Sequence, residues 1–363
     1  MGLLCGVLLR TIMIPEKAGS LLGDKSALLV AIALVFWGGA CSSDQETHSV
    51  EMLSLSNIDL QSTSGRVWSE VRLRELVRLP GEAEDRDLIF TPTAARADRQ
   101  GNIYVVDLHA VAIHGFDSAG SYVATYGGNI GAGPGELMSI VDLGIIGDST
   151  VYIVDENAQR ISYFGLDGAF LRSEVLEFSP VSHQFTSGGR SYSLVGGLTD
   201  HLFETSKGAD IVPFGIVPQA PHGRSSSCCL GFTTTFGNNL LFAPHYFPIL
   251  VQYKPDGTIE YVRGTPDWGT VEPPKWETVG MGGMQGYSFV GQSLHEAISV
   301  DEGKVYVFAY VTSEPGYAVD VYDAQTGTYE YSFRIGEIEN AYMLNQRLYG
   351  REGDTAIVVY AVE

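Results

Sequence analysis

A short strand-like run recurs six times along this 363-residue chain, and this repeat limits the fold more than any other feature. The runs read IYVVD, VYIVD, SYSLV, LLFAP, VYVFA and LYGR and begin at Ile103, Val151, Ser191, Leu240, Val305 and Leu348. The steps between their first residues are 48, 40, 49, 65 and 43 residues. Repeats of this length, made of short strands and turns, are typical of β-propellers, in which each repeat forms one blade.

Each repeat is expected to fold into four antiparallel strands joined by tight turns. The first blade is the clearest, with strands predicted at Thr93–Ala97, Ile103–Asp107, Ala112–Phe116 and Tyr122–Tyr126. Turns with Asp at the start and Gly at the end separate the first strand from the second and the third from the fourth. After residue 65 the sequence has no sustained helical period. The pattern therefore predicts an all-β, six-bladed propeller over residues 66–363.

The last repeat is one strand short, because the chain ends after the run Thr355–Val362. The segment Arg66–Leu79 largely alternates between apolar and polar residues and precedes the first blade. If it pairs with the last run, the ring closes and no sheet edge is left open. Each unpaired backbone group that is buried costs about 1–3 kcal/mol. We therefore expect an N-terminal strand to complete the sixth blade.

The first 65 residues have a different character. Residues 1–40 contain the apolar run Ala27–Trp37, which is too short to span a bilayer and fits a signal peptide, with Met13 as an alternative start. The junction Gly38–Cys41 resembles the lipobox of bacterial lipoproteins, which implies that Cys41 is lipidated. The alternative is an ordinary signal peptide with an incidental cysteine. Residues 41–65 are polar and are expected to form a flexible tether. By the sorting rule of that family, Ser42 implies the outer membrane if the source is a Gram-negative bacterium, with the domain facing the periplasm.

Two segments in the first half of the domain resemble NHL-repeat propellers and bacterial six-bladed propeller lipoproteins. They are Asp155–Phe170, which reads DENAQRISYFGLDGAF, and Gly127–Leu137, which reads GGNIGAGPGEL. The resemblance implies a binding platform, although some relatives of this kind are metal-dependent lactonases or lyases. Later repeats depart from the pattern, because the position of Asp155 is taken by Gly196 and Tyr310.

The formal net charge of −21 disfavours nucleic acids as partners. The charge is compatible with cationic partners or metal ions, or serves solubility alone. No GxSxG, HExxH or Walker pattern is present.

The candidate binding face follows from propeller topology. Loops that join the second and third strands of a blade share a face with the connections between blades. The residues predicted on this decorated face are Asp107, His109, Asp155, Asn157, His245, Tyr246, Trp268, Trp276 and Tyr310. The two tryptophans belong to the long insertion Gly264–Gln292, which accounts for the 65-residue step. This insertion could form a lid or partner contact, or it could plug the channel with its aromatic side chains.

Three kinds of polar group on this face remain open to more than one interpretation. Oxygen ligands for Ca²⁺ at the channel mouth could come from Asp107, Asp155, Glu156 and Asn157. Alternatively, these groups are structural, and Asp155 accepts hydrogen bonds from nearby backbone with Arg160 close by. Cys228 and Cys229 could form a vicinal disulfide, two buried thiols or a soft-metal site. The histidines could converge on a metal, but scattered roles are favoured.

The sequence thus favours a non-catalytic propeller in the cell envelope that binds an unknown protein or small molecule. It contacts the membrane through its N-terminal lipid, and no cofactor is expected. The alternative is a lactonase- or lyase-like enzyme with a cation at the channel mouth, because one fold can support either role.

Overall fold

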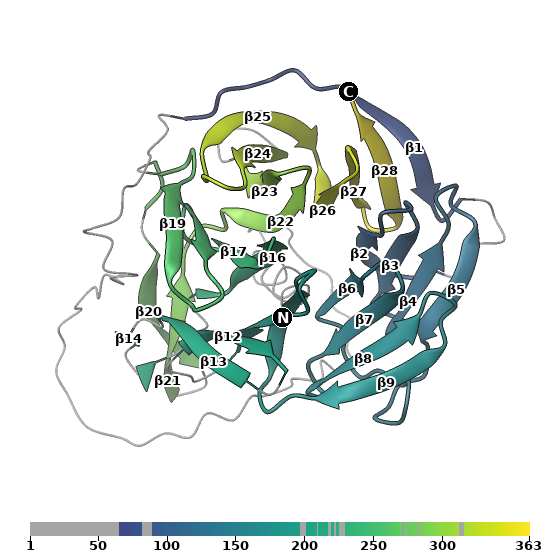
Figure 1. Cartoon of the computed structure of the whole chain (residues 1–363). Coiled ribbons are helices and arrows are strands. Elements are labelled where there is room, and N and C mark those ends of the chain that lie inside the picture. The colour runs from purple at the N-terminus through teal and green to yellow at the C-terminus, as the bar shows by residue number, and fades with distance from the viewer. Residues whose placement is uncertain are drawn as a thin grey trace, which may run out of the picture.

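The computed structural model describes residues 65–81, 89–196, 201–208, 210–216, 219–220, 223–224, 229–268, 270–272, 274–281, 284–311 and 316–363. Six four-stranded antiparallel sheets are arranged around a central axis, as the view down this axis shows (Figure 1). The innermost strands of neighbouring blades contact each other around the ring. The predicted six-bladed propeller is confirmed. In the described part of the chain, no helix is long and apolar enough to cross a membrane.

Each of the first five blades is built from consecutive strands, ordered from the axis outwards. Blade one comprises β2 (Pro92–Ala97), β3 (Ile103–Asp107), β4 (Ala112–Phe116) and β5 (Tyr122–Gly127). Blade two comprises β6 (Asp142–Ile146), β7 (Thr150–Asp155), β8 (Arg160–Gly165) and β9 (Phe170–Val175). Blade three comprises β10 (Pro180–Phe185), β11 (Ser191–Val195), β12 (His201–Lys207) and β13 (Asp210–Ile216).

The second half of the ring follows the same plan. Blade four comprises β16 (Gly231–Phe236), β17 (Asn239–Pro244), β18 (Ile249–Tyr253) and β19 (Ile259–Gly264). Blade five comprises β22 (His295–Asp301), β23 (Lys304–Tyr310), β24 (Tyr317–Asp323) and β25 (Tyr329–Gly336). Blade six comprises β26 (Ile338–Leu344), β27 (Arg347–Glu352), β28 (Ala356–Val362) and β1 (Leu73–Leu79).

The core consists of apolar layers between adjacent blades. One layer joins Tyr104 and Val106 of blade one to Val151 and Phe164 of blade two. Equivalent layers lie at each of the other blade interfaces. The second strands are therefore covered on both faces, and β3 is buried along its whole length. Outermost strands such as β9 are mostly exposed, which explains why their sequences carry more charge.

The predicted closure by an N-terminal strand is confirmed. β1 pairs antiparallel with β28, from Leu73 opposite Val362 to Leu79 opposite Ile357. The strand is shorter than the predicted segment Arg66–Leu79, since it begins at Leu73 and not at Arg66. Before it, Trp68 forms a parallel bridge to Ser332 on the outermost strand of blade five. The N-terminal segment thus covers the edge of one blade and completes the next.

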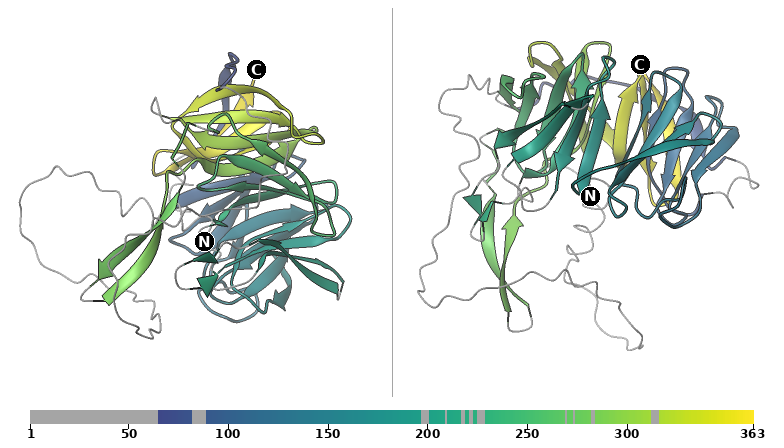
Figure 2. Two further views of the ribbon diagram at one scale, coloured as in Figure 1. Left: turned by 90° about the vertical axis from the view of Figure 1, so that its left-hand side faces the viewer. Right: turned by 60° about the horizontal axis from the view of Figure 1, so that its bottom comes forward.

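Two hairpins lie outside the blades. β20 (Lys275–Met281) and β21 (Met284–Val290) form an antiparallel pair inside the long insertion. This hairpin projects away from the propeller body in both views of Figure 2. A second, very short hairpin joins β14 (Gln219–Ala220) to β15 (Gly223–Arg224). The sequence had suggested only loops in these two connections.

Candidate functional site

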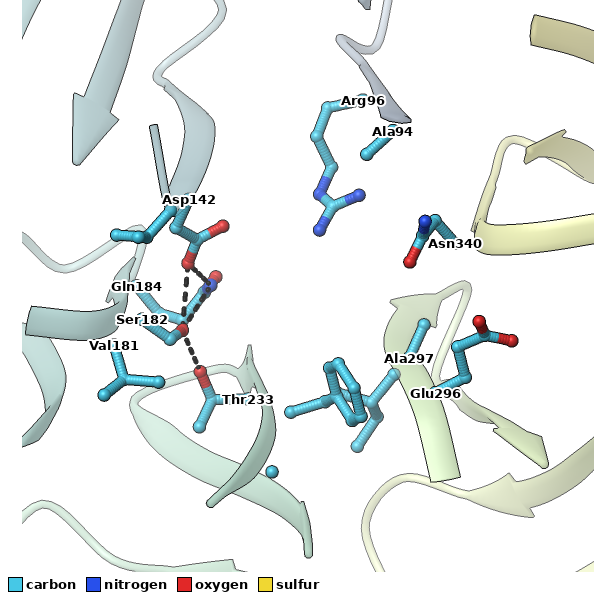
Figure 3. A pocket seen from close by; sticks show the side chains of 14 residues that line it. Ala94, Arg96, Asp142, Val181, Ser182, Gln184, Thr233, Glu296, Ala297 and Asn340 are labelled. Carbon is cyan, nitrogen blue, oxygen red and sulfur yellow. Dashed lines mark hydrogen bonds between the residues drawn. The ribbon is translucent and has the colours of Figure 1, made fainter. Parts of the chain in front are cut away.

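A small cavity lies in the central channel, with a volume of ≈ 50 Å³ (Figure 3). Every blade contributes to it through its innermost strand or the residue just before that strand. The lining residues are Ala94, Arg96, Val141, Asp142, Val181, Ser182, Gln184, Gly231, Phe232, Thr233, Glu296, Ala297, Ile298 and Asn340. We call this cavity the channel pocket.

The channel pocket extends along most of the length of the innermost strands. Asp142 and Gly231 are the first residues of their strands, and Glu296 is the second residue of its strand. The chain enters each innermost strand from the blade-to-blade connection, so these residues stand near the end of the channel where the connections lie. Arg96 and Gln184 are each the second-last residue of their strands and stand nearer the opposite end. The pocket thus extends between the two ends of the channel.

Asp142 links three blades through hydrogen bonds. Its carboxylate accepts from Ser182 Oγ at 2.9 Å, the His183 backbone N–H at 3.1 Å and Gln184 Nε2 at 3.0 Å. Ser182 Oγ lies 2.6 Å from Thr233 Oγ1, which extends the network to blade four. Burial raises the pKa of Asp142, and the positive charge of Arg96 opposes this effect. Asp142 therefore holds the pocket wall together.

Arg96 brings the positive charge in the pocket lining. In Figure 3 its guanidinium points into the space between Asp142 and Asn340. Nη1 donates to the Ala95 carbonyl at 3.0 Å, and the guanidinium carbon lies 5.3 Å from the ring centroid of Tyr342 on blade six. Such a contact is favourable, because the face of an aromatic ring attracts a cation.

Asp107, a predicted site residue, is completely buried and has several hydrogen-bond donors. Its carboxylate accepts from the backbone N–H groups of Phe90 at 2.6 Å, Thr91 at 3.2 Å, His109 at 2.9 Å and Ala110 at 3.2 Å. These donors come from the connection into blade one and from the turn after β3. The side chain thus fixes two loops to each other and faces inward.

Asp155 has the same role in blade two. It is completely buried and accepts from the backbone N–H groups of Met138 at 2.8 Å, Ser139 at 3.1 Å and Ala158 at 3.0 Å. Arg160, which was expected near it, donates to backbone carbonyls of the Gly-rich connection, including Ala132 at 2.7 Å. This arrangement favours the backbone-binding interpretation of both aspartates.

His109 and Asn157 are the exposed members of the predicted set. Each lies in the turn that follows the second strand of its blade. The ring of His109 lies 5.5 Å from that of Phe90, which is also largely exposed. These two residues are available at the surface but lie outside the lining of the channel pocket.

His245 lies beside the channel pocket, and Tyr246 packs against His245 on the side of the hairpin. Nδ1 of His245 is 3.0 Å from the His295 carbonyl, and Nε2 is 2.9 Å from Ser293 Oγ. Its ring centroid is 6.0 Å from that of the pocket residue Phe232. Burial lowers the pKa of His245 to about 4, so the ring is neutral near pH 7. Tyr246 is mostly buried, with 9% of its surface exposed.

Tyr310 also contacts the pocket lining. Its hydroxyl lies 3.5 Å from Oε1 of Glu296, and its ring centroid is 4.8 Å from that of Tyr317. The structure thus places His245 and Tyr310, from blades four and five, next to residues that line the channel pocket. Sequence reasoning had assigned both to the decorated face.

The two tryptophans pack at the base of the insertion. Trp276 is mostly buried against the layer between blades three and four, and its ring lies 5.1 Å from that of Phe289 on the other hairpin strand. Phe289 in turn lies 5.6 Å from Tyr246. Trp268 packs against the same layer and is partly buried. These aromatics therefore anchor the hairpin to the propeller body.

The cysteine predictions fall partly outside the described residues. Cys229 is completely buried in the layer between blades three and four. Cys228 and Cys41 lie outside the described residues, so the vicinal disulfide and the lipidation both remain predictions.

The acidic groups do not gather into a cation site in the described part of the chain. There, no three His, Cys, Asp or Glu side chains are grouped in a way that could hold a metal ion. Asp107 and Asp155 are engaged with separate loops. No Ca²⁺ ligand set can therefore be assigned from these residues.

Sequence reasoning missed the residues of the channel pocket itself. These include Arg96, Asp142, Gln184 and Asn340, which lie on innermost strands, whereas the residues predicted from the sequence lie mainly in loops. One signal was present in the sequence. The strand Pro92–Ala97 reads PTAARA, and its single large charged residue is Arg96.

Comparisons with known proteins agree with the geometry. A sequence comparison with curated proteins gave no match. Among solved structures, a putative exported protein from Bacteroides fragilis has a TM-score of 0.54 and 14% identity, with 83% of this chain and 97% of that chain covered. A member of the DUF4221 family from Bacteroides vulgatus has a TM-score of 0.50 and 12% identity, with 83% and 99% covered. A streptogramin B lyase has a TM-score of 0.50 and 12% identity, with 81% and 100% covered.

At such identities these structures support the fold alone. The model of one protein family, described as 6-bladed beta-propeller (DUF5128), matches residues 79–351. This match covers most of the chain and extends from the last residue of β1 into blade six. The chain therefore belongs to this family of six-bladed β-propellers.

Proposed function

We propose that this protein is a non-catalytic binding propeller of the bacterial cell envelope, and that it takes its ligand at the decorated face over the channel pocket. The observation that carries the proposal is the pocket itself, to which every blade contributes. Half of its lining residues are polar or charged, and Phe232 and Ile298 add apolar walls. Concave sites with convergent polar groups are the usual places for ligands.

Anchoring at the outer membrane, with the domain in the periplasm, is the second part of the proposal. It is supported by the lipobox-like junction before Cys41 and by the polar tether of residues 42–65. The likeness to a protein described as a putative exported protein agrees with this location. Labelling with radioactive palmitate tests it. We expect label in the wild-type chain and none in Cys41→Ala, and equal labelling of both would refute the anchor.

Ligand binding is tested with a pocket-filling variant. Thr233→Met places a longer side chain in the pocket, whereas Thr278→Met, on the exposed part of β20, serves as its matched control. A panel of small polar metabolites is screened by thermal unfolding, because a ligand that binds only the folded state raises the midpoint. We expect at least one compound to stabilise the wild type and the control but not Thr233→Met. Equal stabilisation of all three would refute the pocket as the site.

The competing class is a metal-dependent lactonase- or lyase-like enzyme. Elemental analysis after metal-replete purification, together with lactone and ester hydrolysis assays, separates the two classes. A stoichiometric divalent ion with turnover would overturn the non-catalytic proposal. Turnover that is lost in Glu296→Gln would place the reaction in the channel pocket.

A further inference from the structure

We propose that the channel pocket binds a small molecule with a carboxylate group, and that Arg96 holds this carboxylate. The inference rests on the proposed function above and names the chemical class of the ligand. It is based on the hydrogen bonding of the Arg96 guanidinium. This group carries five N–H donors and no acceptor, and the fold uses few of the donors.

Most of the donors of Arg96 are available for a ligand. One bond is formed, from Nη1 to the carbonyl of the neighbouring Ala95. Within the described residues Arg96 forms no ion pair. Arg66 differs sharply, because it donates to the carboxylates of both Asp267 and Asp320. Arg160 also differs, since its two terminal nitrogens donate to backbone carbonyls. Arg96 thus lines the channel, and most of its N–H donors have no hydrogen-bond acceptor among the described residues.

The guanidinium is also held in place for binding. Its contact with the Tyr342 ring on the neighbouring blade limits its motion. A planar guanidinium can donate two parallel hydrogen bonds to one carboxylate, which suits it better than a lysine to this group. An arginine that is already positioned loses less entropy when the ligand arrives.

Neutral donors surround the same space. Gln184 and Asn340 each carry an amide NH₂ group with two hydrogens. Gln184 Nε2 donates to Asp142 at 3.0 Å and lies 3.5 Å from Ser182 Oγ, whereas Asn340 Nδ2 donates to the Thr93 carbonyl at 2.7 Å. Thr233 adds a hydroxyl group from blade four. These groups can bind the polar atoms next to a carboxylate, such as a neighbouring hydroxyl or carbonyl oxygen.

Charge favours a carboxylate over a phosphate. Besides Arg96, the pocket lining contains the carboxyl groups of Asp142 and Glu296. These groups repel every negative charge of a ligand, so a carboxylate with one charge is opposed less than a phosphate, which carries up to two. The volume of ≈ 50 Å³ is far below the roughly 300–1,000 Å³ of drug-sized sites, so the pocket admits a small acid or the acidic end of a longer molecule.

Acetate is the probe for the test, with inorganic phosphate and chloride as comparison anions at equal ionic strength. Saturation-transfer NMR on the acetate methyl group detects weak binding to the full-length chain. We expect transfer in the wild type and about a tenfold loss of affinity in Arg96→Gln, because the charge-assisted pair is removed. Arg99→Gln removes the same charge from an exposed turn three residues away and is expected to bind like the wild type.

Arg96→Lys is a second variant, which tests whether a loss of binding comes from misfolding. It keeps the positive charge but cannot donate two parallel hydrogen bonds to one carboxylate. It is expected to fold, as judged by near-UV circular dichroism, and to bind acetate with intermediate affinity. The proposal is overturned if Arg96→Gln binds acetate like the wild type, if Arg99→Gln loses binding equally, or if phosphate binds more tightly than acetate. Such a result would leave the metabolite screen of Thr233→Met untouched, so the two proposals fail separately.

Discussion

The guanidinium of Arg66 donates two hydrogen bonds to the fully buried carboxylate of Asp320, from Nε to Oδ1 at 2.8 Å and from Nη2 to Oδ2 at 3.0 Å. The two residues are 254 positions apart in the sequence. Asp320 also accepts from Ser332 Oγ at 2.6 Å, and Arg66 donates to Asp267 at 2.6 and 2.9 Å. This network connects the start of the domain to blade five and to the connection that follows blade four.

Loss of Arg66 is therefore expected to destabilise the domain strongly. In Arg66→Ala, Asp320 stays buried without its cation, a change that typically costs about 3–5 kcal/mol. Arg74→Ala is the control, because Arg74 and Glu363 form an exposed pair 2.6 Å apart. Exposed pairs contribute at most about 1 kcal/mol. Urea unfolding at pH 7 measures both, and equal losses would contradict the importance of burial.

Removal of the closing strand is expected to abolish cooperative folding. Deletion of residues 66–79 leaves β28 as an open edge and removes the Arg66 network. Thermal unfolding monitored by circular dichroism should lose its sharp transition. Deletion of residues 42–64, before the described part of the domain, is the control and should leave the midpoint unchanged. A sharp native-like transition without residues 66–79 would refute closure as a requirement for stability.

Asp155→Ala separates a structural role from a calcium-binding role. The substitution leaves three backbone N–H groups without their acceptor, and we expect a loss of roughly 3 kcal/mol in the free energy of unfolding. Asp354→Ala, at a fully exposed side chain, should change it by less than about 0.5 kcal/mol. Added Ca²⁺ should not raise the unfolding midpoint of the wild type. A rise that disappears in Asp155→Ala would restore the cation hypothesis.

Acid is expected to destabilise the protein through its buried histidines. Burial lowers the pKa of His183 from 6.5 to about 3. Between these values the unfolded chain binds a proton that the folded protein does not, so this contribution is complete above pH 6.5 and is lost as the pH falls. The loss from pH 6.5 to pH 5 amounts to about 2 kcal/mol.

The variant His183→Asn isolates this effect. Its free energy of unfolding should fall less steeply with acid than that of the wild type, and the difference in slope approaches about 1.4 kcal/mol per pH unit. Comparing slopes cancels the opposite effect of Asp142, whose pKa is raised by burial. His109→Asn, at an exposed position, is the control and should retain the wild-type slope. Parallel curves for His183→Asn and the wild type would contradict the prediction.

The strands of the blades were predictable because they depend on local sequence. Ile103–Asp107 and Ala112–Phe116 are bounded by Asp and Gly turns, and the structure has them at the predicted residues. The shorter length of the closing strand was not predictable. Its limit depends on Trp68 and Arg66 binding to blade five, and local alternation carries no signal of such distant partners.

The channel pocket was hidden from the sequence for a related reason. Alternation along a strand shows which side chains share a face of that strand. It does not show which side chains of the six innermost strands point into the same part of the central channel. Arg96 and Glu296 line one cavity although 200 positions separate them. The loops were easier to interpret, and His245 and Tyr310 do lie beside the pocket. Asp107 and Asp155 were harder, because the same acidic residue could serve either a cation or nearby backbone.

The pairing of β1 with β28 also has a consequence for folding during synthesis. In the chain, β1 precedes the other strands of the propeller and its partner β28 follows them. Arg74 and Glu363, which form a hydrogen bond beside this pairing, are 289 positions apart in the sequence. The strands from β2 to β27 are synthesised between β1 and β28, so the ring cannot close before β28 has been made. Until β28 is available, β1 lacks its pairing partner, so closure of the ring depends on a strand that is distant from β1 in the sequence.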